Sequence, residues 1–152
     1  MTPGLLFLPS GASLSGNPLL MQTEQARPQK RRVLVVDDDA ALSQIFQHLL
    51  EAYHYEVITA ANGALALKQI VAQDVDAILC DLKMPELEGD LFYGAVERIK
   101  PHLCSRFIFI TGAAEDPKYR KFLSQVKSPV LHKPVLSANL LEELRRLLET
   151  PP

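Results

Sequence analysis

The sequence predicts an α/β fold, a doubly wound, five-stranded parallel sheet with helices on both faces. Three observations lead to it. Short apolar runs alternate with amphipathic stretches between residues 33 and 149. The first run, Val33–Val36, is apolar at every position, as expected for a strand that helices bury on both faces. A helical segment and short loops join each run to the next, which favours parallel pairing through right-handed crossovers.

The first two expected helices each carry a one-sided apolar pattern. In the first helix, apolar residues recur at i, i+3, i+4, i+7 and i+8, and one of Asp38 or Asp39 can cap its first turn. The second helix opens at Asn62-Gly63. The apolar faces consist of Leu42, Ile45, Phe46, Leu49 and Leu50 in a helix over 40–52, and of Leu67, Ile70 and Val71 in the helix that follows a strand over 56–60.

The second half of the chain repeats the pattern three times. Pro101 ends the third helix because proline cannot continue a helix interior. Glu115-Asp116-Pro117 opens the fourth helix, since acidic residues and proline are favoured in a first turn. The remaining expected elements are strands over 76–81, 106–111 and 129–132, a third helix over 90–100, and a last helix over 137–149 that aligns Leu140, Leu141, Leu144, Leu147 and Leu148.

Length and composition indicate one domain. The 152 residues suffice for a single core, with 47% apolar and 22% charged residues. We expect residues 1–30 to be a flexible extension, with Met21 as an alternative start, and 31–150 to be the domain. The chain ends two prolines after the last helix, so no output domain is expected. The net charge of −2 argues against nucleic-acid binding, and no run is long enough to span a membrane.

Polar residues follow four of the expected strands, and in open α/β sheets such strand ends meet at one edge. Asp37 and Asp38 follow the first strand, and Asp81, Thr111 and Lys133 follow later ones. Converging carboxylates repel one another unless they share a cation, and a few carboxylates with open positions suit Mg²⁺. A carboxylate beside Mg²⁺, a lysine and a hydroxyl can attack a phosphoryl group.

Four stretches of the chain, in order and at suitable spacing, resemble the receiver domain of two-component response regulators. They are Val35–Asp38, Cys80–Pro85 with Gly89, Phe109–Gly112 and Leu131–Pro134. The resemblance covers residues 32–149 and implies the flavodoxin-like (βα)5 receiver fold. The last two stretches are similar to those of receivers fused behind histidine kinases.

The resemblance implies a role for each residue that follows a strand. Asp81 is the phosphoacceptor, and Asp38 binds Mg²⁺ directly. Asp37 helps to bind the metal directly or through water, and the backbone carbonyl of Lys83 supplies a further ligand. Thr111 and Lys133 contact the phosphoryl group, the bond from Lys133 to Pro134 is cis, and the loop of Met84, Pro85 and Gly89 shapes the site.

The resemblance also implies the partners. A histidine kinase or a phosphotransfer protein donates the phosphoryl group, a downstream protein reads the result, and a homodimer is a further option. A receiver catalyses only its own phosphotransfer and dephosphorylation. Cys80 and Cys104 show no metal-ligand spacing, so we expect a reduced, cytoplasmic setting. The cognate kinase, the output and the lifetime of the acyl phosphate do not follow from the sequence.

Two features depart from the family pattern. Many receivers carry Tyr or Phe three residues before the lysine, where this chain has Val130, and Val135 stands where Phe often follows the Lys-Pro pair. An aromatic switch therefore cannot operate at residue 130 in the usual way. A pseudo-receiver that serves only as a docking or dimerising scaffold thus stays open as an alternative.

A second alternative is a small haloacid-dehalogenase-like phosphatase. In that interpretation Asp37 is the nucleophile and Asp39 the acid/base, with Thr111 and Lys133 at later strand ends. The chain offers neither a later pair of acidic residues for the metal nor a cap domain. The alternative also leaves Asp81 unexplained.

Overall fold

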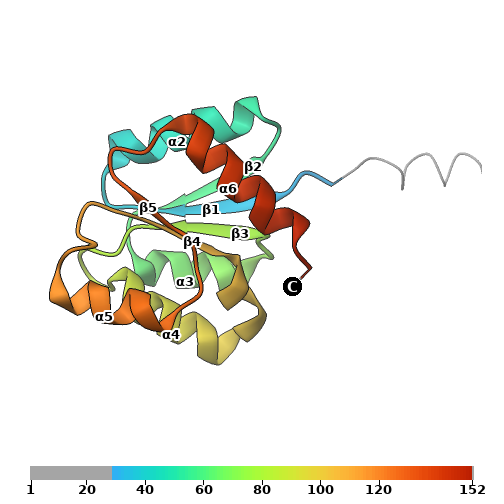
Figure 1. The fold of residues 1–152 in the computed structure, drawn as a ribbon. Helices are drawn as coiled ribbons and strands as arrows, with labels where there is room; N and C mark the ends of the chain where they lie inside the picture. Colours follow the sequence, from blue (N-terminus) through green and yellow to red (C-terminus); the bar gives the residue numbers. More distant parts are fainter. Residues whose placement is uncertain (1–28, 152) are drawn as a thin grey trace, which may run out of the picture.

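The computed structural model describes residues 29–151. Its single sheet has five parallel strands in the order β2-β1-β3-β4-β5, and helices cover both faces (Figure 1). The strands are β1 (Arg32–Val36), β2 (Glu56–Ala60), β3 (Ala77–Cys80), β4 (Phe107–Thr111) and β5 (Val130–His132). The helices are α2 (Ala40–Ala52), α3 (Gly63–Ala72), α4 (Gly89–Ile99), the 3₁₀ helix η1 (Pro101–Arg106), α5 (Pro117–Gln125) and α6 (Ser137–Glu149). The predicted doubly wound fold is confirmed.

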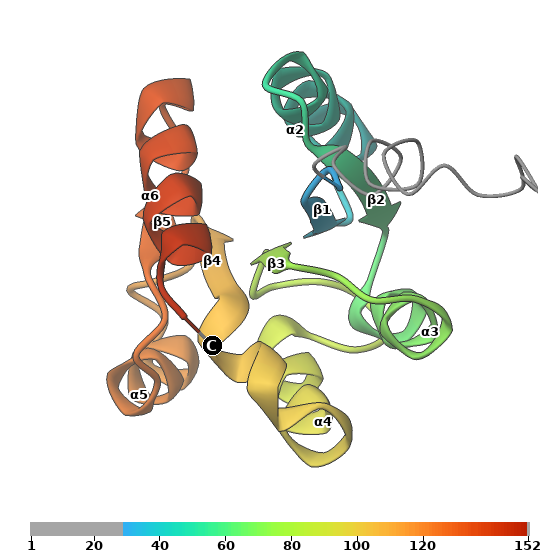
Figure 2. The same ribbon diagram turned by 90° about the vertical axis from the view of Figure 1, so that its right-hand side faces the viewer.

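The sheet separates two apolar cores. Helices α2 and α6 cover one face, and α3, α4 and α5 cover the other (Figure 2). Side chains of β1, β3 and β4 alternate between the two cores because successive strand residues point to opposite faces. Leu34 and Phe109 lie in the core beneath α3, α4 and α5, whereas Val35 and Ile110 lie in the core beneath α2 and α6. The run Val33–Val36 of β1 is therefore buried on both faces of the sheet, as predicted.

Helix starts follow the capping residues in the sequence. The Asp39 carboxylate accepts a hydrogen bond from the backbone N–H of Leu42, so Asp39 caps α2 and Asp38 does not. Asn62 caps α3 in the same way. Asp116 caps α5, with Pro117 as its first residue. These local signals made the helix starts predictable.

Three details differ from the expectations. Ile45 and Val71 were predicted on the buried faces of α2 and α3, but their side chains are 61% and 71% exposed. Each helix touches the sheet along a narrower stripe, in which Phe46 and Ile70 are the buried neighbours. The third difference is η1, because no helix was expected between Pro101 and the strand that begins at residue 106.

The topology creates a crevice at the carboxyl ends of β1 and β3. The chain leaves β1 for β2 on one side and later returns to β3 on the other, and such a switch point is the usual ligand site of an open α/β sheet. Residues 1–28 of the expected extension lie outside the described residues. Between residues 29 and 151, no helix has the length and apolar character needed to cross a membrane.

Candidate functional site

Asp37 and Asp81 are brought together by the pairing of β1 with β3. Val36 and Cys80 are partners in the register, so the residue after each strand reaches the same level. The backbone N–H of Asp81 donates to the carbonyl of Val36 at 2.9 Å, which continues the ladder one step beyond β3. The N–H of Asp37 likewise donates to Ala60 of β2 at 3.1 Å. Main-chain hydrogen bonds thus position both carboxylates.

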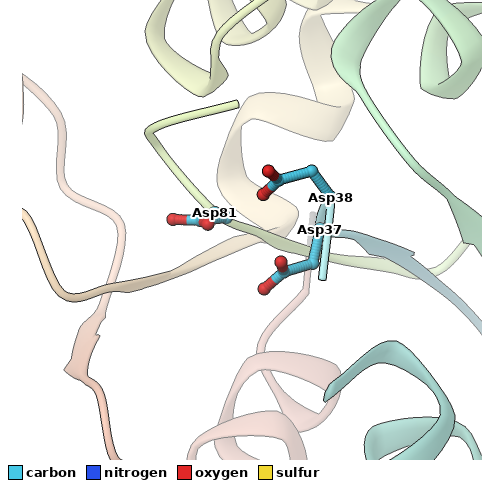
Figure 3. Close-up of side chains that lie close together, drawn as sticks. All are labelled: Asp37, Asp38 and Asp81. Carbon is cyan, nitrogen blue, oxygen red and sulfur yellow. The ribbon is translucent and has the colours of Figure 1, made fainter. Parts of the chain in front are cut away.

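Three carboxylates form what we call the acid pocket, which consists of Asp37, Asp38 and Asp81 (Figure 3). One oxygen from each lies within 4.8 Å of the others. Asp37 and Asp81 are buried, at 4% and 7% exposed, whereas Asp38 is exposed. The acid pocket is therefore buried at Asp37 and Asp81 and open to solvent at Asp38.

Lys133 connects the two buried carboxylates of the acid pocket. Its Nζ lies 3.0 Å from Asp37 Oδ2 and 3.0 Å from Asp81 Oδ2, and its side chain is 26% exposed. The N–H of Lys133 donates to the carbonyl of Thr111 at 3.0 Å, which holds the main chain beside β4. The peptide bond from Lys133 to Pro134 is cis, as the resemblance implied.

The charges of this group are strongly coupled. Burial raises the pKa of Asp81, and the repulsion from Asp37 adds to this effect. Hydrogen bonding and attraction to Lys133 oppose the shift without cancelling it. For Lys133, burial disfavours the ammonium, but its hydrogen bonds to Asp37 and Asp81 outweigh burial and raise its pKa. A fixed ammonium thus lies beside a carboxylate that has lost much of its hydration.

Thr111 ends the neighbouring strand β4 and is fully buried. Its Oγ1 accepts a hydrogen bond from the N–H of Ala113 at 2.9 Å. Among the described residues, its hydroxyl has no hydrogen bond to the acid pocket. Its main-chain link to Lys133 places both residues at the same edge of the sheet. The hydroxyl thus takes part in the turn that leads towards α5.

The loop between β3 and α4 is closely packed against Asp81. The N–H of Gly89 donates to the carbonyl of Leu82 at 2.8 Å, and a Cβ at residue 89 would lie 2.3 Å from the carbonyl oxygen of Asp81. Only glycine permits this approach. The Lys83 side chain is exposed. The role of its backbone carbonyl as a metal ligand stays a prediction.

A polar contact between this loop and α5 was not predicted from the sequence. Glu88 was not singled out, yet its carboxylate accepts a hydrogen bond from Tyr119 and pairs with Lys118. Tyr119 Oη lies 3.0 Å from Glu88 Oε2, and its ring is 2% exposed. The only local signal was a glutamate at a position that favours short capping residues.

Val130, at the position where many receivers carry an aromatic residue, packs against a core that contains several aromatic rings. Val130 is half-buried on β5 and pairs with Phe109 of β4. The ring of Phe122 on α5 meets that of Phe109 edge-on, with 5.3 Å between centroids, and meets that of Tyr93 on α4 at 5.5 Å. His132, the last residue of β5, is exposed.

Residues 33–145 match the sequence model of the response regulator receiver domain, with the acid pocket and Lys133 inside the match. The chain belongs to this family. As a receiver, it is similar in fold to the CheY-like receiver of Methanospirillum hungatei, with a TM-score of 0.73, 30% identity, and 79% of this chain and 94% of that chain covered. It is also similar to TrrA of Thermotoga maritima, solved with Mg²⁺-BeF, with a TM-score of 0.67, 27% identity, and coverage of 78% and 99%.

The curated relatives of this receiver are longer proteins of different kinds. The 3',5'-cyclic-nucleotide phosphodiesterase regA of Dictyostelium discoideum is 30% identical over 134 residues, which cover 84% of this chain and 16% of that protein. The sensor kinase CckA of Brucella abortus is 30% identical over 119 residues, which cover 77% of this chain and 12% of that protein. The receiver thus spans less than one fifth of the length of either relative.

Proposed function

We propose that this receiver accepts a phosphoryl group on Asp81, with Mg²⁺ in the acid pocket, and passes the signal on through protein contacts. The observation that carries the proposal is the position of Lys133, whose Nζ contacts Asp37 and Asp81 at the same distance of 3.0 Å. A histidine kinase or a phosphotransfer protein in the cytoplasm is the proposed donor.

The acid pocket fits a divalent cation by the chemistry of its donors. Carboxylate oxygens are hard ligands, and Mg²⁺ binds a few of them, some through the waters that it retains. Asp37, Asp38 and Asp81 would hold the ion together with the carbonyl of Lys83, and the exposed side at Asp38 leaves room for water and phosphate. When bound, Mg²⁺ offsets the charge that builds up on the phosphoryl oxygens.

The residues of the chain carry the transfer itself. A carboxylate oxygen of Asp81 attacks the phosphorus of a phosphohistidine. The new P–O bond forms as the P–N bond breaks, and the electron pair stays on the imidazole nitrogen. Lys133, already hydrogen-bonded to Asp81, offsets the negative charge of the phosphoryl group, and the Thr111 hydroxyl donates a hydrogen bond to it.

The phosphatase alternative loses support in the structure. Asp39, its expected acid/base, is exposed and uses its carboxylate to cap α2. The scaffold alternative keeps one supporting observation, the half-buried Val130 where a switch aromatic is usual.

The position of the modified aspartate separates these functions. The protein is incubated with acetyl phosphate and Mg²⁺, the acyl phosphate is reduced with borohydride, and the modified residue is located by peptide mass. We expect modification of Asp81, its loss in Asp81→Asn, and its persistence in the control Asp39→Asn. Modification of Asp37 would support the phosphatase. A chain that stays unmodified with acetyl phosphate and with phosphorylated histidine kinases would support the scaffold.

A further inference from the structure

A polar contact joins the β3–α4 loop to the first turn of α5. Glu88 Oε2 accepts a hydrogen bond from the Tyr119 hydroxyl at 3.0 Å and pairs with the ammonium of Lys118. The Tyr119 ring lies in the core beneath α3, α4 and α5. We call these three residues the Glu88 bridge. It ties α5 to a loop that begins directly after Asp81.

Glu88 does not serve the helix on which it lies. It occupies the N-cap of α4, where short polar side chains are favoured because they reach back to the first free amides. Its own side chain makes no capping hydrogen bond. The longer glutamate side chain extends instead to α5. At the N-caps of α2, α3 and α5, by contrast, an Asp or Asn side chain makes a capping hydrogen bond. Its contribution to the structure is therefore the contact with Tyr119 and Lys118.

The residues on either side of Glu88 are both held in place, Gly89 against Asp81 and Leu87 against the start of α3. Gly89 is hydrogen-bonded to Leu82 at 2.8 Å and packs directly against the Asp81 carbonyl. The carbonyl of Leu87 accepts a hydrogen bond from the N–H of Gly63 at 3.0 Å. Glu88 therefore lies next to a residue that is in direct van der Waals contact with the main chain of Asp81.

A second connection runs from the site to the same helix. Thr111 Oγ1 accepts from the N–H of Ala113 at 2.9 Å, and the carbonyl of Ala113 accepts from the N–H of Asp116 at 3.0 Å. Asp116 caps α5, one residue before Pro117. A movement of the Thr111 hydroxyl would therefore displace the first turn of α5. The Glu88 bridge links the same turn to the β3–α4 loop.

We propose that the Glu88 bridge holds α5 in the unphosphorylated arrangement, and that modification of Asp81 releases α5 by weakening this bridge. The inference rests on the proposed function. A phosphoryl group recruits the Thr111 hydroxyl, which strains the turn through Ala113 against the bridge. Since Val130 provides no aromatic switch on β5, the bridge supplies the two-state contact. By linkage, a partner that prefers released α5 also favours modified Asp81.

The test is the affinity of the full chain for beryllofluoride in the presence of Mg²⁺, followed by NMR signals of backbone amides in 111–125. Tyr119→Phe removes only the hydroxyl, and Glu88→Gln removes only the charge. If the bridge restrains the inactive arrangement, both variants should bind beryllofluoride about fivefold more tightly than the wild type, the lower end of typical allosteric couplings. Amides of α5 should also exchange faster with solvent before the ligand is added.

Two control variants match these changes away from the bridge. Tyr93→Phe also removes a tyrosine hydroxyl, from a ring that packs against Phe122 of α5 but is not part of the Glu88 bridge. Glu97→Gln makes the same change as Glu88→Gln at an exposed glutamate in the second half of α4. Both controls should keep the wild-type affinity. Thermal unfolding of all four variants checks that each is folded at the temperature of the titration.

The outcomes separate the two proposals. Unchanged or weaker binding by Tyr119→Phe and Glu88→Gln, with normal binding by the wild type, overturns the role of the bridge and leaves the proposed function intact. Tighter binding by the controls to the same degree also overturns it. A wild type that binds no beryllofluoride overturns the proposed function and this inference with it.

Discussion

At the scale of single residues, the site depends on one ammonium and two buried carboxylates. Lys133 contacts Asp37 and Asp81, yet the pKa of Asp81 stays raised because burial outweighs the attraction. The charged form of Asp81 is therefore less favourable in the folded chain than in the unfolded chain. Burial of the Asp81 carboxylate therefore lowers the free energy of unfolding of the domain while no cation or phosphoryl group is bound.

The raised pKa of Asp81 predicts that the effect of Asp81→Asn on the free energy of unfolding depends on pH. EDTA is present to keep metal ions out of the site. A raised carboxyl pKa means that the folded state binds more protons, so wild-type stability falls as pH rises from 3.8 through the folded pKa. The stability advantage of Asp81→Asn should grow across this window and stay constant above it. Urea unfolding at a series of pH values measures it. An advantage that shrinks as pH rises would contradict the prediction.

At the scale of elements, α4 contains two glycines that differ in the space available for a side chain. Gly89, its first residue, packs on the Asp81 carbonyl, where a Cβ would lie 2.3 Å from the oxygen. Gly94 lies in the helix interior, where a Cβ would meet no atom within 4 Å. The first glycine thus serves the site. The second only adds backbone freedom to the unfolded chain.

Alanine substitutions at the two positions should therefore change stability in opposite directions. Gly94→Ala should raise the free energy of unfolding by about 0.5–1 kcal/mol, the usual difference between alanine and glycine within a helix. Gly89→Ala should lower it by about 1–3 kcal/mol, because the main chain at Asp81 must move. Chemical denaturation of both variants measures the two changes. Equal effects would show that the packing at residue 89 is unimportant.

At the scale of the whole molecule, the acid pocket exists only when the sheet is assembled. Asp37 and Asp81 follow β1 and β3, and Lys133 follows β5, 96 residues after Asp37. In the unfolded chain these groups are far apart, so a ligand of the pocket binds the folded state alone. Ligand binding and global stability are therefore coupled.

Mg²⁺ should accordingly stabilise the entire domain. At a concentration of about 100 times its dissociation constant, Mg²⁺ should raise the free energy of unfolding by about 2.7 kcal/mol, and EDTA should reverse the change. Asp38→Asn should weaken the effect, because this exposed carboxylate faces the open side of the pocket. Asp39→Asn is the matched control, since Asp39 caps α2. Thermal unfolding at increasing Mg²⁺ measures the response.

The sequence by itself determined the order of strands and helices, and with it the edge at which Asp37, Asp81 and Lys133 meet. Apolar runs that alternate with amphipathic stretches leave a parallel sheet as the compact solution, and its strand ends share one edge. Capping is also local, so neighbouring residues limited the cap of α2 to Asp38 or Asp39 and placed the start of α5 at Glu115-Asp116-Pro117.

Only the tertiary structure decided how the elements are set against one another. Periodicity places Ile45 on the apolar side of α2, but the angle of the helix on the sheet leaves it 61% exposed. The contact of Glu88 with Tyr119 joins residues 31 positions apart on different elements. No local pattern encodes such a contact, because it depends on how the β3–α4 loop and α5 pack together.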